Sequence, residues 1–155
     1  MLLEDSDSVI QLLQESFQES DTFFLPVLPT RKSARHFYKL EIEPAVINGD
    51  PCFIVEHERE VIAFNCASTC INKIYDLKSK VALGVLTVVK KPYRRQGIAE
   101  VLRYKVMQGL KSLDVEYVMC DIFEPNAPSF LGMKKICKEA GLKPELFFKR
   151  YGSKI

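Results

Sequence analysis

Apolar side chains at helical spacing dominate the beginning of the chain and predict two helices there. The first helix is expected to open at Ser8, which with Gln11 matches a capping box, and to run through Phe17. A segment with two prolines follows and should interrupt the helical pattern. The second helix is expected from about residue 31 to residue 43, where Pro44 should end it.

Runs of apolar and β-branched residues in the middle of the chain predict three strands. Residues 52–56 and 61–67 flank a short polar link, which is typical of a hairpin. Residues 81–89 form a nearly continuous apolar run, which predicts a strand buried on both faces. Gly84 inside this run indicates a bulge or a close backbone approach. The polar segment between them, residues 68–80, is expected to be a loop.

The second half of the chain predicts two more helices and two more strands. Helices are expected over about 97–113 and 128–140, with a strand over 117–123 between them. Residues 146–151 can close the sheet. The predicted order is therefore α-α-β-β-β-α-β-α-β, an α/β (α+β) fold. At 155 residues the chain is expected to form one domain, residues 1–155.

Composition narrows the classes of partner. With 22 basic and 20 acidic residues the net charge is only +2, so no general affinity for nucleic acid or membranes is expected. We also expect no signal peptide and no membrane span, and hence a cytoplasmic protein. The five cysteines indicate reduced thiols in an intracellular compartment. Cys66 and Cys70 are too far apart for a C-x-x-C motif, so no metal is expected.

The segment 94–99 lies between the apolar strand and the amphipathic helix, and it contains the residues best suited to bind a ligand. A strand-to-helix turn directs unpaired backbone N–H groups and the positive end of the helix dipole at one spot. Gly97 lets the backbone approach an anion closely, and Arg94 and Arg95 can add charge-assisted hydrogen bonds. The segment therefore predicts a phosphate or pyrophosphate site.

Arg94-x-x-Gly97-x-Ala99, led by Pro92 and Tyr93, resembles the acetyl-CoA signature of the GNAT superfamily of N-acetyltransferases. The resemblance implies a mixed, mostly antiparallel sheet with helices on both faces, and acetyl-CoA as the cofactor. The family usually begins with a strand and ends with two. This chain offers only two leucines for the first strand, and about one strand fits at its end.

The same resemblance assigns cofactor-binding residues. It implies that Thr87, Val88 and Val89 pair with the pantetheine arm. It further implies that one loop holds the pyrophosphate through Arg94, Arg95, Gln96, Gly97, Ile98 and Ala99. Asn126 and Ser129 match an element that touches the cofactor in many members, although both also suit a helix N-cap.

Catalytic residues are less evident from the sequence. Val85 stands where many members carry a carboxylate base, and Met133 stands where many carry a tyrosine acid. Glu19 and Glu124 are the candidates that remain for proton transfer. Residues 12–19 resemble the start of insect-type arylalkylamine N-acetyltransferases, in which an acidic pair is linked to amine binding.

The expected activity is acetyl transfer from acetyl-CoA to a primary amine of a small molecule. Two alternatives stay open: acetylation of a protein lysine or N-terminus, and a non-catalytic module that binds acyl-CoA or a partner protein. A generic mononucleotide site is disfavoured, since neither glycine-rich nucleotide fingerprint occurs. Incomplete terminal strands leave open a homodimer, in which a second copy completes the sheet.

Overall fold

This computed structural model describes residues 3–19, 29–75, 78–120, 122 and 127–139. Its four described strands form one mixed sheet in the order β1-β2-β3-β4; they are β1 (Cys52–His57), β2 (Glu60–Ser68), β3 (Val81–Val89) and β4 (Tyr117–Cys120). β2 pairs antiparallel with both β1 and β3, whereas β3 and β4 are parallel. The predicted mixed, mostly antiparallel sheet is therefore confirmed.

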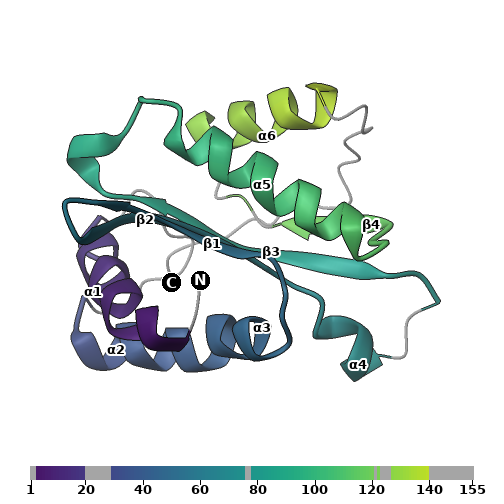
Figure 1. Ribbon diagram of the computed structural model, residues 1–155, viewed down its shortest axis with the longest axis horizontal. Coiled ribbons are helices and arrows are strands. Elements are labelled where there is room, and N and C mark those ends of the chain that lie inside the picture. Colours follow the sequence, from purple (N-terminus) through teal and green to yellow (C-terminus); the bar gives the residue numbers. More distant parts are fainter. Residues whose placement is uncertain (1–2, 20–28, 76–77, 121, 123–126, 140–155) are drawn as a thin grey trace, which may run out of the picture.

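Helices cover both faces of this sheet, as predicted (Figure 1). One face carries α1 (Ser6–Ser16), α2 (Arg31–Phe37) and α3 (Glu43–Ile47). The other carries α5 (Ile98–Ser112) and α6 (Ala127–Glu139). Short helical turns complete the described elements: η1 (Leu3–Asp5), the π-helix η2 (Tyr38–Ile42), α4 (Ile71–Tyr75) and η3 (Lys91–Tyr93). Among the described helices, none has the length and apolar character that crossing a bilayer requires.

The hairpin and the long apolar strand form where the sequence predicts them. The β1–β2 connection turns at Glu58 and Arg59, both with positive φ, which matches the right-handed twist of the flanking strands. β3 spans the predicted residues, but its middle (83–87) is only partly buried. The predicted burial on both faces therefore holds at the ends of β3 and is wrong for its centre.

Both predictions at Gly84 are confirmed. The register with β2 runs Cys66 to Leu86 and Ala67 to Gly84, so Val85 is the extra residue of a bulge. A Cβ on Gly84 would lie 3.1 Å from the Cβ of Cys120 on β4. The bulge turns the neighbouring side chains of Val85 and Leu86 toward the same core cluster.

The predicted helix start at Ser8 is wrong. α1 begins at Ser6 after Asp5, and no side chain caps it, so Ser8 lies inside the helix. The 3-10 turn η1 leads directly into α1, so helical geometry is already present before the predicted cap. Leu3 belongs to this turn and not to a first strand.

Pro44 does not end the second helical region, contrary to prediction. The helix continues from α2 through a π-helical turn into α3, and Pro44 lies in the first turn of α3. A proline is tolerated there because its missing N–H has no intrahelical acceptor. The N–H of Glu43 instead bonds to the carbonyl of Tyr38 across the wider turn.

The polar segment predicted as a loop contains the short helix α4, so this prediction is wrong in part. The side chain of Asn72 joins α4 to the start of β3 by two hydrogen bonds. Its Nδ2 donates to the carbonyl of Val81 at 2.7 Å, and its Oδ1 accepts from the N–H of Val81 at 2.9 Å. One side chain thus replaces a neighbouring strand at the start of β3.

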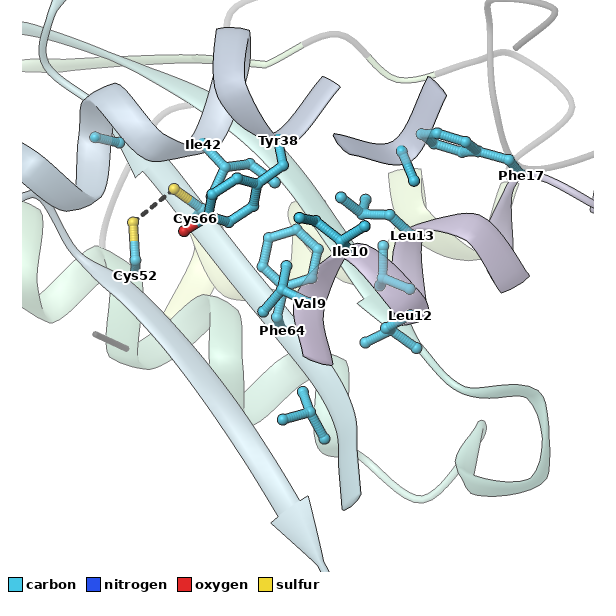
Figure 2. Packing of buried hydrophobic residues seen from close by; sticks show 14 residues of the cluster. Val9, Ile10, Leu12, Leu13, Phe17, Tyr38, Ile42, Cys52, Phe64 and Cys66 are labelled. Atoms are coloured by element: carbon cyan, nitrogen blue, oxygen red, sulfur yellow. Dashed lines mark hydrogen bonds between the residues drawn. The ribbon is translucent and has the colours of Figure 1, made fainter. Parts of the chain in front are cut away.

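The main core lies between β2 and the helices α1 to α3. Phe64 at its centre is fully buried and packs with Val9, Leu13, Tyr38 and Ile42 (Figure 2). A smaller pair of clusters joins α5 to the opposite face through Ala63, Ala67, Ala82, Val89, Leu102, Val106 and Leu110. The alanines on the sheet let α5 approach closely.

The helices predicted over 97–113 and 128–140 correspond to α5 and α6. The described part of the strand predicted over 117–123 is β4, which ends at Cys120. The strand predicted over 146–151 lies outside the described residues.

Candidate functional site

The turn between β3 and α5 has the backbone geometry of an anion cradle. Arg95 and Gly97 both adopt left-handed conformations, with φ of 62° and 81°. Gly97 precedes α5 without a side-chain cap. The backbone N–H groups of residues 95–100 have no acceptor among the described residues. Such N–H groups at a helix start, joined by the positive end of the helix dipole, form a site for a phosphate group.

The two arginines of this turn have different surroundings. Arg94 donates from Nε to the carbonyl of Val89 at 2.8 Å, and its Nη2 lies 2.5 Å from the carboxylate of Glu19. Arg95 is exposed on the left-handed turn, and Gln96 donates back to the carbonyl of Pro92 at 3.3 Å. Arg95 is therefore the arginine open to an incoming anion, whereas Arg94 holds the turn against its neighbours.

The C-terminal half of β3 leaves one edge unpaired within the described residues. Its described parallel pairing with β4 ends where Gly84 faces Cys120, so residues 85–89 pair with no described strand on that side. Thr87 and Val89 point toward α5, whereas Val88 points toward the core under α1. An open strand edge can bond an extended ligand as an added strand.

A hollow of about 290 Å³ lies beside the turn, between α5 and α6. Its lining combines apolar and acidic side chains, namely Val101, Tyr104 and Ile136 with Glu100 and Glu139, and it reaches Gly97. Ile98 and Ala99 open α5 and pack onto the cluster around Leu102.

Ser129 and Thr87, two predicted cofactor residues, are brought together by a third residue. Arg103 of α5 donates from Nη2 to the hydroxyl of Ser129 at 2.7 Å and from Nε to the hydroxyl of Thr87 at 3.4 Å. The sequence reasoning missed Arg103. A single charge in the otherwise apolar stripe of Ala99, Val106 and Leu110 is the signal that could have found it.

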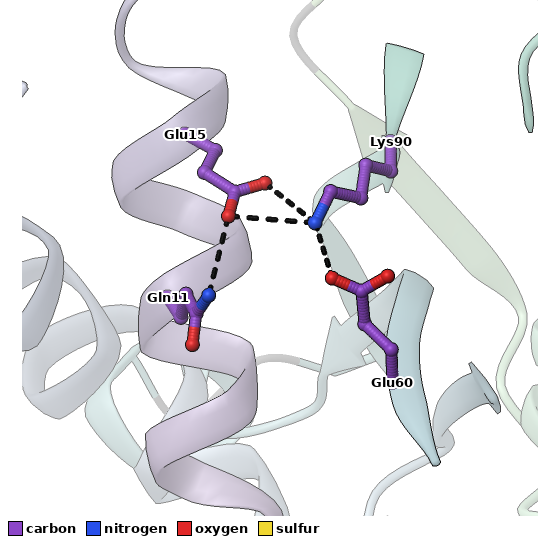
Figure 3. A network of polar contacts seen from close by, with 4 residues as sticks. All are labelled: Gln11, Glu15, Glu60 and Lys90. Atoms are coloured by element: carbon purple, nitrogen blue, oxygen red, sulfur yellow. Dashed lines mark hydrogen bonds and ion pairs between the residues drawn. The ribbon is translucent and has the colours of Figure 1, made fainter. Parts of the chain in front are cut away.

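α1 is fastened to the segment before the turn by ion pairs. The ammonium of Lys90 lies 3.1 Å from Glu15 and also pairs with Glu60, while Gln11 donates to Glu15 (Figure 3). The hydrogen bond to Glu60, with a smaller contribution from Glu15, raises the pKa of Lys90. Together with the pair of Glu19 and Arg94, these contacts place the end of α1 beside the anion cradle.

The catalytic candidates are only partly located. Glu19 lies at the cradle, whereas Glu124 and the cofactor candidate Asn126 lie outside the described residues. Val85 packs against the main core and Met133 is partly buried on α6. Neither side chain has a titratable group, so neither supplies an acid or a base.

An anion cradle at a helix start, next to an open strand edge, defines a protein that can bind a long, phosphate-bearing cofactor. The sequence matches the model of the acetyltransferase (GNAT) family over residues 13–131, and the chain belongs to this family. Members of the family are N-acetyltransferases that use acetyl-CoA, so the predicted enzyme class and cofactor are confirmed at the level of the family. No curated protein matches the chain in sequence.

Solved structures with the same fold include several acetyltransferases. Ribosomal-protein-alanine N-acetyltransferase from Brucella melitensis is 15% identical with a TM-score of 0.66, and the match covers 85% of this chain and 77% of that one. Diaminobutyrate acetyltransferase from Paenibacillus lautus, bound to L-2,4-diaminobutyric acid and coenzyme A, is 17% identical with a TM-score of 0.62, over 90% and 73%. An aminoglycoside acetyltransferase from an uncultured soil metagenomic sample, bound to sisomicin, is 16% identical with a TM-score of 0.62, over 99% and 93%.

Proposed function

We propose that this protein transfers an acetyl group from acetyl-CoA to a primary amine of a small molecule. The observation that carries the proposal is the set of unengaged N–H groups at residues 95–100, which opens beside the unpaired edge of β3. The N–H groups and Arg95 suit a pyrophosphate, and the strand edge suits an amide-bearing arm. The whole chain, residues 1–155, is proposed to form this one domain.

We assign each part of the proposed reaction to residues around the cofactor site. Residues 95–99 hold the phosphates, and residues 87–89 hold the arm that leads to the reacting group. Bound acetyl-CoA supplies the acetyl group as a thioester. Glu19 is proposed to accept the proton of the acceptor amine. In the structure its carboxylate is paired with Arg94.

A small amine is favoured as the acceptor by the chemistry of related folds. The diaminobutyrate and aminoglycoside enzymes are bound to small molecules that carry amino groups, whereas the Brucella protein is named for a ribosomal protein. The resemblance of residues 12–19 to arylalkylamine enzymes supports the same choice. A thiol-release assay with diaminobutyrate, an aminoglycoside, phenylethylamine and alanine- or lysine-containing peptides separates these classes.

Two glycines provide a matched test of the cofactor site. Gly97 and Gly49 both have left-handed φ, at 81° and 75°, and a Cβ at either position meets no atom within 4 Å. Replacing either by valine should cost a similar free energy of unfolding, about 1–2 kcal/mol from backbone strain. We expect Gly97→Val to abolish coenzyme A binding in calorimetry and Gly49→Val to retain it. Undiminished binding by Gly97→Val, or equal loss in both variants, would contradict the proposal.

A further inference from the structure

Arg103 is a cation on a face of α5 that otherwise carries apolar residues. It shares one face of α5 with Ala99, Val106 and Leu110, all of which pack toward the sheet. Its guanidinium is held between β3 and α6 by the hydroxyls of Thr87 and Ser129. Arg103 therefore joins β3 to α6, next to the edge of β3 that no described strand pairs.

No carboxylate neutralises Arg103 in the part of the chain that the structure describes. Burial lowers the pKa of its guanidinium below the ordinary value. Arg103 is partly buried, and the partial desolvation of a cation with no counter-ion among the described residues costs free energy that an apolar residue of similar volume would not cost. Stability alone thus gives no reason for an arginine at this position.

Gly132 on α6 makes room for the guanidinium. A Cβ at this position would lie 2.6 Å from Nη1 of Arg103. A glycine inside a helix lowers the free energy of unfolding by about 1 kcal/mol relative to alanine, so helix propensity does not favour Gly132. Arg103 and Gly132 face each other across α5 and α6, local propensity favours neither, and together they accommodate one charged group. This combination indicates that the group serves a ligand.

The position of Arg103 along β3 indicates which part of the ligand it meets. Thr87 lies two residues before Val89, roughly 7 Å along the strand from the end that leads to the anion cradle. The phosphates are expected at the cradle, so the guanidinium lies beside the uncharged arm that follows them. A guanidinium carries about five N–H donors, more than the two hydroxyls can accept.

We propose that Arg103 is a cofactor-binding residue that donates hydrogen bonds to the amide carbonyl oxygens of the pantetheine arm. This inference rests on the proposed function, because it requires the arm of coenzyme A to lie along the open edge of β3. A bond from a charged donor is stronger than one between neutral groups, so one residue can fix the position of the arm.

The test compares two ligands that differ by the arm. Calorimetry measures the binding of coenzyme A and of adenosine 3′-phosphate 5′-diphosphate, which retains the phosphates and lacks pantetheine. We expect Arg103→Leu to weaken coenzyme A binding by about 10- to 100-fold and to change binding of the short ligand by less than about 2-fold. Arg103→Gln keeps hydrogen-bond donors without the charge, so its affinity for coenzyme A should lie between those of the wild type and Arg103→Leu.

Controls separate a local contact from charge and from folding. Lys105→Leu removes an exposed positive charge from the same helix and should bind both ligands as the wild type does. The thermal midpoint of Arg103→Leu should equal or exceed that of the wild type. Equal weakening for both ligands, or unchanged coenzyme A binding, overturns the role of Arg103. Failure of the wild type to bind coenzyme A overturns the proposed function itself, so the two failures are distinguishable.

Discussion

The carboxylate of Glu19 lies 2.5 Å from the guanidinium of Arg94, three residues beyond the end of α1. Arg94 also donates to the carbonyl of Val89, so one side chain joins the α1 end, the β3 end and the anion cradle. A proposed proton acceptor and a proposed phosphate loop are thus in direct contact. A substitution of either residue should therefore alter the function proposed for the other.

Glu19→Gln should separate the two roles of this pair. Removal of the negative charge leaves Arg94 more available to an anion, so coenzyme A binding should strengthen by about 2- to 5-fold at low salt, and less at high salt. Turnover should fall, since the proposed proton acceptor is lost. Because the two side chains remain 35% and 27% exposed, the free energy of unfolding should fall by less than about 1 kcal/mol.

Calorimetry at two salt concentrations and a thiol-release assay check these outcomes. Glu56→Gln removes an exposed carboxylate from β1 and should leave both measurements unchanged. Weaker coenzyme A binding in Glu19→Gln would show that Glu19 supports the cradle and does not compete with it.

Tyr38→Phe should stabilise the protein. The Tyr38 side chain is fully buried, and its hydroxyl has no hydrogen-bond partner among the described residues. Removal of an unsatisfied buried hydroxyl should raise the free energy of unfolding by about 1 kcal/mol at pH 7, measured by urea denaturation. A lower stability of Tyr38→Phe would show that the hydroxyl is bonded in solution.

The same variant should change the alkaline limit of stability. Burial, followed by the charge of Glu43, raises the pKa of Tyr38 from 10.0 to about 12. The unfolded chain therefore loses this proton first, and stability falls as the pH rises from about 10 to 12, by up to about 3 kcal/mol. We expect Tyr38→Phe to lose less stability over this interval than the wild type.

Lys90→Met should loosen α1 from the sheet. Lys90 joins Glu15 of α1 to Glu60 of β2, and both carboxylates are more than one-third exposed, so the loss should be about 1 kcal/mol or less. Because its pKa is raised, the contribution of Lys90 is complete below its ordinary pKa and is lost as the pH rises through the higher value. Urea denaturation at low and high salt measures this effect.

The matched control is Lys105→Met, which removes an exposed lysine from α5. The difference between the two variants should shrink at high salt because ions screen the pairs. An equal effect of both substitutions would assign the loss to net charge and not to the contacts of Lys90.

Local patterns predicted the elements that carry the cofactor site. The bounds of β3 follow from its apolar run, and Gly97 indicates the left-handed turn before α5. The errors arise from local geometry that the residue pattern does not indicate, or from a side chain that bonds to another element. Pro44 is accommodated by a π-helical turn, and the side-chain bonds of Asn72 to β3 order a segment that looks like a loop.

The sequence by itself determined β3, the anion-binding turn and α5, because side-chain alternation, helical spacing and the conformational freedom of Gly97 are properties of neighbouring residues. Only the tertiary structure decided that Arg94 meets Glu19 and that Arg103 lies between Thr87 and Ser129. These contacts join residues far apart in the chain, and they depend on how the helices pack against the sheet. No local pattern encodes that packing.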